Sequence, residues 1–487
     1  MRKNIRSFII GSIVSASFLS GCNVDKLDLY PETNLTEGNF YTSEADLISA
    51  SNDIYRQLTR IYNSGGVPDL YGELFSDNVY IKQTTGANSF GEDISGHTIK
   101  PDNGYVETAW NNAYNALYII NNVLDKLQNT TVVFSDPALK KRLASEALVV
   151  RSIIYYYLTQ AFGDVPFPLK VVTPDESYTY LREHKNVIYQ QLIADLLKAK
   201  SVLPNSYTGS NAGRLTSHAA GALLAKVYLA AGNSNAAKAQ LLEIIQSNQF
   251  TLDANGDGKI TKDDYAYLFK SDTKNSKESI LEVQYLSGQN NVNSTHQADY
   301  APWDFAFHLP GISTTFRGNG LNTPTGDLIR EYESNDPRKE LSLQLGFTNL
   351  QTGSFIDYPY TIKFFDGTFL YPGQNVEAIR YADILLLYAE LTGESSYLNQ
   401  VRARAGLADY GTSAYPTDKY PTLALAIEHE RRVELAFEFH RFFDLVRTGR
   451  AVAVLSSNKG IQIAANKLLF PIPLSAIDAN PNLTQNP

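Results

Sequence analysis

The stretch AAGALLAKVYLAAGNSNAAKAQLLEIIQSNQ, residues 219–249, contains two apolar-patterned segments on either side of Gly232. In both segments apolar residues recur every three or four positions, which is the periodicity of a helix. Small residues occur where two helices would approach each other, and larger side chains such as Leu224, Tyr228 and Leu241 would fill the groove between them. The stretch therefore predicts a pair of packed helices.

The spacing of this pair, with Ala225 and Ala237 flanking Gly232, is that of a tetratricopeptide repeat. Helical periodicity recurs in paired blocks elsewhere in the chain. The blocks span residues 43–62, 104–128, 137–162, 184–203, 217–231 and 234–247, and then residues 378–391, 396–405 and 422–448. We therefore expect an all-α fold, a tetratricopeptide-like helical repeat scaffold over about residues 43–249 and 378–448.

A loop-rich stretch separates these two helical parts. Over about residues 250–377, Gly, Asn, Asp, Pro and aromatic residues replace the helical pattern. So long a stretch within a compact domain is most often functional. We expect a single domain over residues 22–487, with this stretch as a loop-rich, irregular insertion that binds the ligand. A smaller loop region spans residues 65–103.

The N-terminus changes from basic to apolar and then reaches a cysteine. Basic residues at positions 2, 3 and 6 precede an apolar run over residues 8–19, which is shorter than the roughly 20 residues needed to span a bilayer. Leu19-Ser20-Gly21 then leads to Cys22, the only cysteine in the chain. We expect residues 1–21 to be a lipoprotein signal peptide and Cys22 to carry the covalent lipid, including an acyl chain such as palmitate, that anchors the protein in a membrane. The alternative is an ordinary secretory signal with an accidental cysteine.

Composition narrows the class of ligand. Without residues 1–21, the chain has 39 basic residues against 51 acidic ones, a net charge of about −12, and no cysteine for a disulfide. Nucleic-acid binding draws on clusters of Lys and Arg, and no such cluster occurs, so we expect no nucleic-acid partner. The 31 tyrosines suit a helical core and a sugar-binding surface equally.

Short motifs recur in order from one end of the mature chain to the other. They are Cys22-Asn23 followed by LDLYP (27–31); a helix from Ala144 with Glu146 and Arg151 that ends in FGDVP (162–166); IRYAD (379–383) running to Ala389-Glu390; VRARAGL (401–407); HERRVELAFE (429–438) with Arg441 and DLVR (444–447); and LFPIP (469–473) followed by Asn480-Pro481. In this ordered set the chain resembles the SusD/RagB family of nutrient-binding lipoproteins in Bacteroidetes outer membranes.

The resemblance implies both a fold and a function. It implies a helical scaffold of tetratricopeptide-like units with a glycan site on the loop side, on a lipid-anchored, surface-exposed protein. It further implies that bound oligosaccharide is delivered to a SusC-like, TonB-dependent outer-membrane transporter, without enzymatic activity. The motifs do not extend into residues 65–103 or 284–371, where we expect the identity of the ligand to be determined.

The last helical block contains charges at helical spacing. These residues are Arg431, Glu434, Glu438, Arg441, Asp444 and Arg447. We expect a ladder of ion pairs along one helix face. Guanidinium neighbours keep carboxylates ionised, whereas acid–base catalysis needs carboxyl groups with separated pKa values. The ladder is therefore interpreted as structural.

Two other motifs have structural interpretations. Phe162-Gly163, followed by Pro166, is typical of a helix end, since glycine favours the position after the last helical residue. Trp110 has Tyr114 and Leu117 at helical spacing on the same face, so we expect it in the core.

DANGDGKITKDD, residues 253–264, matches a calcium-binding loop position by position. The predicted ligands are Asp253, Asn255, Asp257, the carbonyl of Lys259, and Asp264. Gly258 would allow the sharp turn at the sixth position, while Asp264 replaces the usual bidentate glutamate and should weaken the site. We expect structural calcium that holds the start of the loop-rich stretch. The alternative is a polar turn, because Asp, Asn and Gly favour turns.

The candidate ligand-binding residues lie in the two loop regions. Trp303, Tyr300, Phe305 and His308 place aromatic rings beside polar groups, a combination that suits stacking on a sugar ring. From the first loop region, Asp77, Asn78, Tyr80 and Phe90 are candidates for the same surface. The alternative for Trp303 is a small apolar core beneath the loop.

No catalytic signature accompanies these residues. The seven histidines are scattered, and the chain has no HExxH, Gly-x-Ser-x-Gly or phosphate-loop motif. We therefore expect a non-catalytic protein that binds oligosaccharides. The alternatives are a peptide- or protein-binding adaptor of a nutrient-uptake complex and, less favoured, a glycoside hydrolase built from two carboxylates far apart in the chain.

Overall fold

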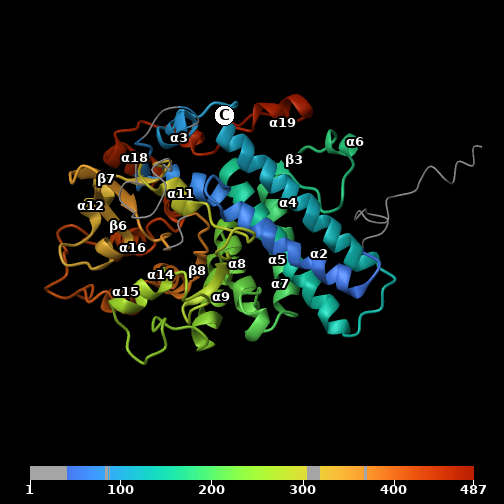
Figure 1. Ribbon diagram of the computed structural model, residues 1–487, viewed down its shortest axis with the longest axis horizontal. Helices are drawn as coiled ribbons and strands as arrows, with labels where there is room; N and C mark the ends of the chain where they lie inside the picture. Colours follow the sequence, from blue (N-terminus) through green and yellow to red (C-terminus); the bar gives the residue numbers. More distant parts are fainter. Residues whose placement is uncertain (1–40, 83–85, 87, 304–317, 367–369) are drawn as a thin grey trace, which may run out of the picture.

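The computed structural model describes residues 41–487, apart from 83–85, 87, 304–317 and 367–369. Its long helices pack beside one another (Figure 1). Helical elements before residue 250 are α2 (Glu44–Tyr62), η2 (Pro68–Leu74), α3 (Asn88–Ser95), α4 (Gly104–Asn129), α5 (Pro137–Phe162), α6 (Pro174–Ser177), α7 (Lys185–Lys200), η3 (Gly209–Asn211), α8 (Ser217–Ala230) and α9 (Ser234–Gln246). Those after it are α10 (Lys262–Leu268), α11 (His296–Tyr300), α12 (Gly326–Glu331), α13 (Arg338–Ser342), α14 (Tyr381–Thr392), α15 (Ser395–Arg404), α16 (Leu423–Glu434), α17 (Arg441–Arg447), α18 (Ala451–Lys459), η5 (Ala465–Lys467) and α19 (Leu474–Ala479).

Helices of the first part follow the sequence periodicity closely. The bounds of α5 coincide with the predicted block, and those of α2, α4, α8 and α9 agree within a residue at each end. Gly163, with φ of +72°, ends α5 as predicted. Helix α7 stops at Lys200 instead of Leu203, because Pro204 disfavours helical geometry in the residue before it.

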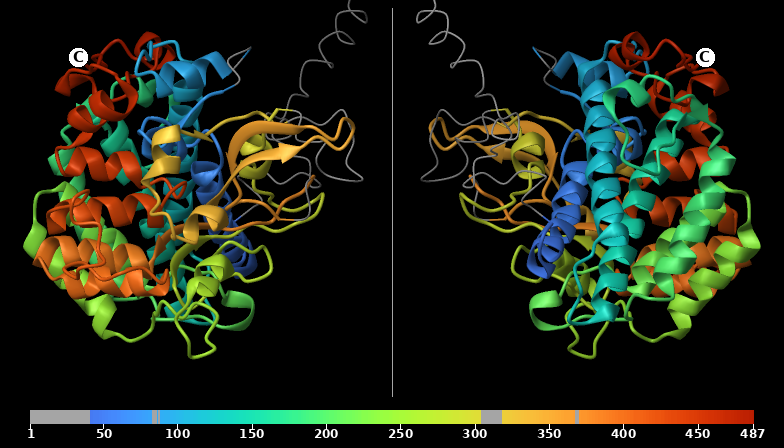
Figure 2. Two further views of the ribbon diagram at one scale, coloured as in Figure 1. Left: turned by 90° about the vertical axis from the view of Figure 1, so that its left-hand side faces the viewer. Right: turned by 90° about the vertical axis from the view of Figure 1, so that its right-hand side faces the viewer.

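The predicted helix pair is α8 and α9. Ala220 and Leu224 of α8 are fully buried, as is Leu241 of α9, and each large aliphatic side chain contributes about 1.5–3 kcal/mol on burial. Gly232 has φ of +75°, which lets the chain reverse between the helices. Successive helices α4, α5, α7, α8 and α9 each pack on the next (Figure 2, right). The tetratricopeptide-like helical fold is thus confirmed.

Trp110 lies in the core of this scaffold. Its ring is 5% exposed and packs against Tyr114 and Phe162 at centroid distances of 4.7 and 4.9 Å. The core interpretation of this tryptophan is confirmed.

The block predicted as one helix over residues 422–448 is two helices, α16 and α17. Between them Phe437 and Phe439 have positive φ angles of 68° and 66°, a strained conformation for residues other than glycine. The N–H groups of both phenylalanines donate to the buried carboxylate of Glu73, at 3.2 and 3.3 Å. The break is therefore held by a residue of η2, far away in the sequence.

The charges of this segment do not form the predicted ladder along one helix face. Arg431 and Arg447 do both pair with Asp444, at 2.7 and 3.0 Å. The buried charges pair mostly with distant residues, however: Glu434 accepts from Arg338 at 2.8 Å, Arg380 at 2.5 Å and Arg404. Burial would raise the pKa of Glu434, but the guanidinium groups of Arg404, Arg380 and Arg338 hold it well below its usual range. The residues are ionised and structural, as expected, but most of their partners come from other segments of the chain and not from the same helix face.

The described residues contain four short antiparallel strand pairs, three of which involve the loop-rich stretch. The pairs are β1 (Val79–Tyr80) with β5 (Thr323–Pro324), β2 (Val165–Pro166) with β3 (Arg182–Glu183), β4 (Ser279–Val283) with β8 (Val376–Arg380), and β6 (Leu343–Thr348) with β7 (Phe355–Thr361). Because β8 contains Ala378, the helix predicted over 378–391 begins only at Tyr381. The β6–β7 hairpin projects from the helical body (Figure 2, left).

Candidate functional site

A cleft lies where the helical scaffold meets the loop-rich stretch. It is bounded by the end of α2, by η2 and α4, and by α11 with residues 319–322. Its volume is about 420 Å³, within the range of about 300–1,000 Å³ typical of small-molecule sites. Its polar lining consists of Arg60, Asn63, Ser64, Asp69, Tyr105, Thr108, Asn112, Thr295, Asp299, Asn319 and Asn322.

Asp69 holds the floor of this cleft together. Its buried carboxylate accepts hydrogen bonds from the N–H of Gly65 at 2.8 Å, the hydroxyl of Tyr300 at 2.7 Å and the amide of Asn322 at 2.6 Å. Burial raises the pKa of Asp69 to about 6, although the hydrogen bonds act in the opposite direction. Through Asp69, the α2–η2 turn is joined to α11 and to the segment after residue 318.

The wall of the cleft joins the two loop regions. The Tyr105 hydroxyl donates to the Asn88 side chain at 3.4 Å, and the Tyr105 ring meets that of Phe90 edge-on at 6.0 Å. The amide of Asn88 donates to the carbonyl of Asn319 at 2.8 Å, and the amide of Asn319 donates to Asp299 at 2.6 Å. These contacts place Asn88 and Tyr105 beside Asp299 and Asn319.

The chemistry of the cleft suits an uncharged ligand rich in hydroxyl groups. Amide and hydroxyl side chains both donate and accept hydrogen bonds, as hydroxyl groups do. The half-buried ring of Tyr105 adds an apolar face. Both carboxyl groups of the cleft, Asp69 and Asp299, already accept hydrogen bonds that hold its walls.

Asp77 and Asn78, two candidate ligand-binding residues, are buried and do not line the cleft. Asp77 pairs with Arg441 at 2.7 Å and Arg432 at 2.8 Å, and these guanidinium groups overcome the effect of burial and hold the pKa of Asp77 well below its usual range. The Asn78 amide donates to the Glu73 carboxylate at 3.0 Å. Their assignment to the ligand surface is corrected: sequence proximity to the loop did not reveal the arginines that pair with them.

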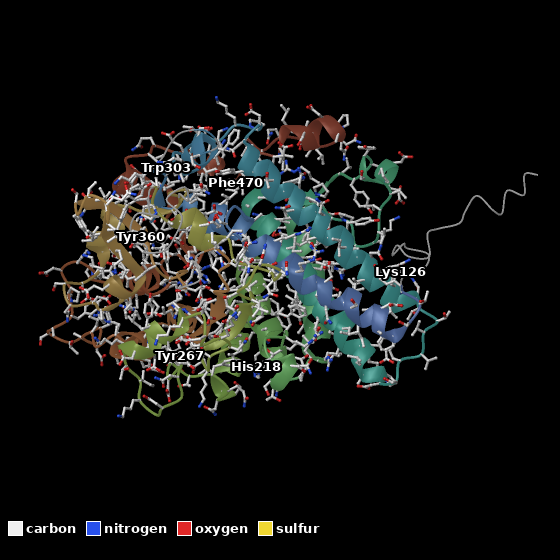
Figure 3. All side chains as sticks on the ribbon, in the orientation of Figure 1. Lys126, His218, Tyr267, Trp303, Tyr360 and Phe470 are labelled. Carbon is white, nitrogen blue, oxygen red and sulfur yellow. The ribbon has the colours of Figure 1, made fainter. Side chains whose placement is uncertain are left out.

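The assignment of Tyr300 to the ligand surface is also corrected. This residue is 1% exposed, and its hydroxyl donates to Asp69 from beneath the floor of the cleft. Trp303 is 38% exposed and lies toward the same part of the molecule as Tyr360, on the loop-rich side (Figure 3). Tyr80 and Phe90 are partly buried, and Tyr80 pairs with Thr323 across β1 and β5. Phe305 and His308 lie outside the described residues.

Sequence reasoning missed the α4 residues of the cleft. Tyr105, Thr108 and Asn112 lie three and four positions apart, so they share one helix face and line the cleft together. This spacing was a usable signal, because a polar face directly after a loop region departs from the apolar pattern of α4. Asn319 and Asn322 gave no signal, since loop asparagines are common.

The predicted calcium loop has the expected turns. Gly256 and Gly258 have φ of +73° and +87°, and the side-chain oxygens of Asp253 and Asn255 both accept from the N–H of Asp257, at 3.1 and 2.8 Å. Asp264 is fully buried and accepts from Asn255 and Thr261 as part of the N-terminal cap of α10. Among the described residues, no three His, Cys, Asp or Glu side chains are arranged to hold a metal ion.

Cys22 lies outside the described residues. In the part of the chain that is described, no helix is both long and apolar enough to cross a membrane.

Fold and cleft together define a helical-repeat binding protein. Comparison with known families specifies it further: the model of the SusD family matches residues 348–487, and a model described as starch-binding associating with outer membrane matches residues 27–229. The chain belongs to the SusD/RagB family.

Individual relatives cover almost the whole chain. SusD-like protein P2 of Formosa agariphila is 26% identical over 99% of both chains. A SusD-like protein of Bacteroides ovatus is also 26% identical, over 92% of this chain and 83% of the relative. Among solved structures, a laminarin binding SusD-like protein superposes with a TM-score of 0.76 and 26% identity, covering 91% of this chain and 99% of that one.

Proposed function

We propose that this chain is a lipid-anchored protein of the outer-membrane surface that binds oligosaccharides in the cleft and delivers them to a SusC-like, TonB-dependent transporter. The observation that carries the proposal is the cleft itself, an amide-rich lining around Tyr105 at the junction of scaffold and loops. A relative named for laminarin binding and a family description naming starch support a glucan as the class of ligand.

The bound glycan is released uncleaved in this proposal. Glycoside hydrolases use a carboxyl pair, one as acid and one as base or nucleophile. Asp69 and Asp299 both line the cleft, and burial raises the pKa of each. However, Asp69 already accepts three hydrogen bonds from beneath and beside the cleft, and Asp299 accepts one from Asn319. We infer that both carboxyl groups shape the cleft and perform no chemistry.

Membrane attachment rests on Cys22 and its preceding residues. Two acyl chains anchor a protein stably, whereas one binds only marginally. We expect Cys22→Ala to abolish labelling by a radioactive fatty acid and to remove the protein from the membrane fraction. Equal labelling of the variant and the wild type would contradict the anchor.

Glycan binding is tested with the soluble form that lacks residues 1–22, titrated calorimetrically with laminarin and with starch oligosaccharides. We expect Tyr105→Ala to weaken binding by about 1–3 kcal/mol, the cost of truncating an aromatic anchor. The matched control is Tyr118→Ala, which removes an exposed tyrosine from the same helix outside the cleft.

Other outcomes separate the alternatives. Equal affinities in the two variants would contradict the cleft as the binding site. Release of reducing ends from either polysaccharide would favour a hydrolase, and Asp299→Asn would then abolish it. Binding of peptides without any binding on a glycan array would favour the adaptor.

A structural calcium ion at the start of the loop-rich stretch is also part of the proposal. The oxygens of Asp253 and Asn255 converge on one N–H group, and Asp257 follows them in the order of a calcium loop. We propose that calcium replaces this N–H as their shared partner, with the Lys259 carbonyl and Asp264 completing the ligand set.

A further inference from the structure

A second cavity, here called the pit, lies within the helical scaffold. It is lined by residues of α5, α7, α8, α14 and α17, opens to solvent and has a volume of about 220 Å³. The rings of Tyr156, Tyr157, Tyr189 and Phe443 form its walls. None of its lining residues belongs to the cleft. It is therefore a separate space.

The charged groups around the pit are mostly paired already. The Lys226 ammonium binds the buried carboxylate of Asp383 at 2.7 Å, and the Arg447 guanidinium pairs with Glu390 and, at 3.0 Å, with Asp444. A charged ligand would have to compete with these ion pairs. An uncharged ligand would leave them intact.

One buried polar atom of a residue that lines the pit lacks a partner among the described residues. His440 is 8% exposed, and its buried Nε2 makes no hydrogen bond with any described residue. Burial lowers the pKa of His440 to about 4, so that its imidazole is neutral at physiological pH. Tyr156, which also lines the pit, carries a hydroxyl group. Because an unpaired buried polar atom costs stability, Nε2 of His440 is suited to a hydroxyl group that enters the pit.

We propose that the pit binds one neutral sugar ring, as a second site that goes beyond the glycan cleft. Its volume is below that of sites for drug-sized ligands, which limits the ligand to a single ring. The tyrosine rings offer apolar faces to the C–H face of a pyranose. His440 and Tyr156 then bind its hydroxyl groups.

The test adds bulk without removing any existing contact. Ala230 lines the pit at the end of α8, whereas the next residue, Ala231, is exposed and outside it. We expect Ala230→Phe to weaken binding of glucose, galactose or mannose, measured by ligand-observed NMR, by about tenfold or more. The matched control Ala231→Phe should bind as the wild type does.

Further variants separate this site from the cleft and from a folding defect. Tyr156→Phe removes only a hydroxyl and should weaken monosaccharide binding with an unchanged melting temperature. Tyr105→Ala, which alters the cleft, should leave monosaccharide binding in the pit intact. The proposal is overturned if no neutral monosaccharide binds, if Ala230→Phe binds as tightly as Ala231→Phe, or if only glucuronate binds.

Discussion

The helix-pair scaffold and the loop-rich stretch are stabilised by different interactions. In the scaffold, small and large apolar side chains of neighbouring helices pack together, as Ala220, Leu224 and Leu241 do. The loop-rich stretch is instead attached to the C-terminal part of the chain, from Arg380 onward, by buried ion pairs. These are Glu278 with Arg380 and Arg404, Arg338 with Glu430 and Glu434, and Lys363 with Glu438.

The two kinds of interaction differ in how far apart in the sequence their partners lie. Apolar packing between successive helices leaves a local pattern, because its spacing repeats every three or four residues. A buried ion pair leaves no such pattern: Glu278 and Arg404 are 126 positions apart. It is also less tolerant of change, since a charge that loses its partner in the interior is strongly unfavourable.

Removing the centre of the ion-pair network should have the largest effect. Glu434 is fully buried and pairs with Arg338, Arg380 and Arg404. Glu434→Ala leaves these guanidinium groups short of negative charge, and we expect it to lower the free energy of unfolding by about 3–5 kcal/mol. Urea denaturation followed by circular dichroism measures the loss.

An exposed ion pair provides the control. Lys170 and Glu176 interact at 2.8 Å but are 64% and 43% exposed, so Lys170→Ala should change the free energy of unfolding by less than about 1 kcal/mol. Similar losses in the two variants would contradict the role assigned to the buried network.

The same distinction explains which parts of the fold could be predicted. Helices α2, α4, α5, α7, α8 and α9 were predictable because local periodicity, Gly163 and Gly232 determine most of their extent, whereas the short helices α3 and α6 were not predicted. The break between α16 and α17 was not, because Glu73 imposes it through the backbone of Phe437 and Phe439.

The candidate site was predictable as a region but not residue by residue. The loop regions meet at the cleft, as the placement of Asn88 beside Asn319 indicates. The Asp77 side chain is chemically suited to binding a ligand, but its partner Arg441 is 364 positions away in the sequence. The polar residues around Asp77 give no sign of such a partner, so the burial of Asp77 could not be predicted.

A buried carboxyl pair makes the junction of loops and helices sensitive to pH. Glu282 and Glu377 are opposite each other in the β4–β8 pair. Burial raises the pKa of Glu282 to about 7, and burial together with repulsion from Glu282 raises that of Glu377 well above its usual value. A raised carboxyl pKa contributes stability that is fully present below the unfolded-state pKa, about 4.5, and is lost as the pH rises through 7.

Glu282→Gln should remove this loss. We expect the variant and the wild type to have similar stabilities near pH 5, and the variant to be more stable near pH 8 by about 2–3 kcal/mol. Melting temperatures across this range measure the difference. Glu340→Gln, at an exposed glutamate, is the control. A difference between Glu282→Gln and wild type that stays constant with pH would contradict the raised pKa of Glu282.

Trp303 tests whether the loop-rich stretch offers a binding platform or a small core. Because its ring is 38% exposed, Trp303→Ala should weaken glycan binding by about 1–3 kcal/mol and change the melting temperature little. A core residue would instead cost about 3–5 kcal/mol of stability. Tyr178→Ala, at a 47% exposed tyrosine of the helical side, should alter neither quantity. Intact affinity in Trp303→Ala, or a collapse of its stability, would exclude the platform.

Calcium should have the smallest effect, because it would hold only the first turn of the loop-rich stretch. With Asp264 in place of a bidentate glutamate, we expect the weak affinity of extracellular modules, with Kd of about 0.1–1 mM. At about ten times Kd, bound calcium stabilises the folded state by roughly 1.4 kcal/mol, so a chelator should lower the melting temperature slightly. Asp257→Ala should melt at the same temperature with and without calcium, while Asp263→Ala, outside the predicted ligand set, should retain the calcium effect. Identical melting curves of the wild type in calcium and in chelator would exclude the ion and leave residues 253–264 as a turn held by the hydrogen bonds of its own asparagine and aspartates.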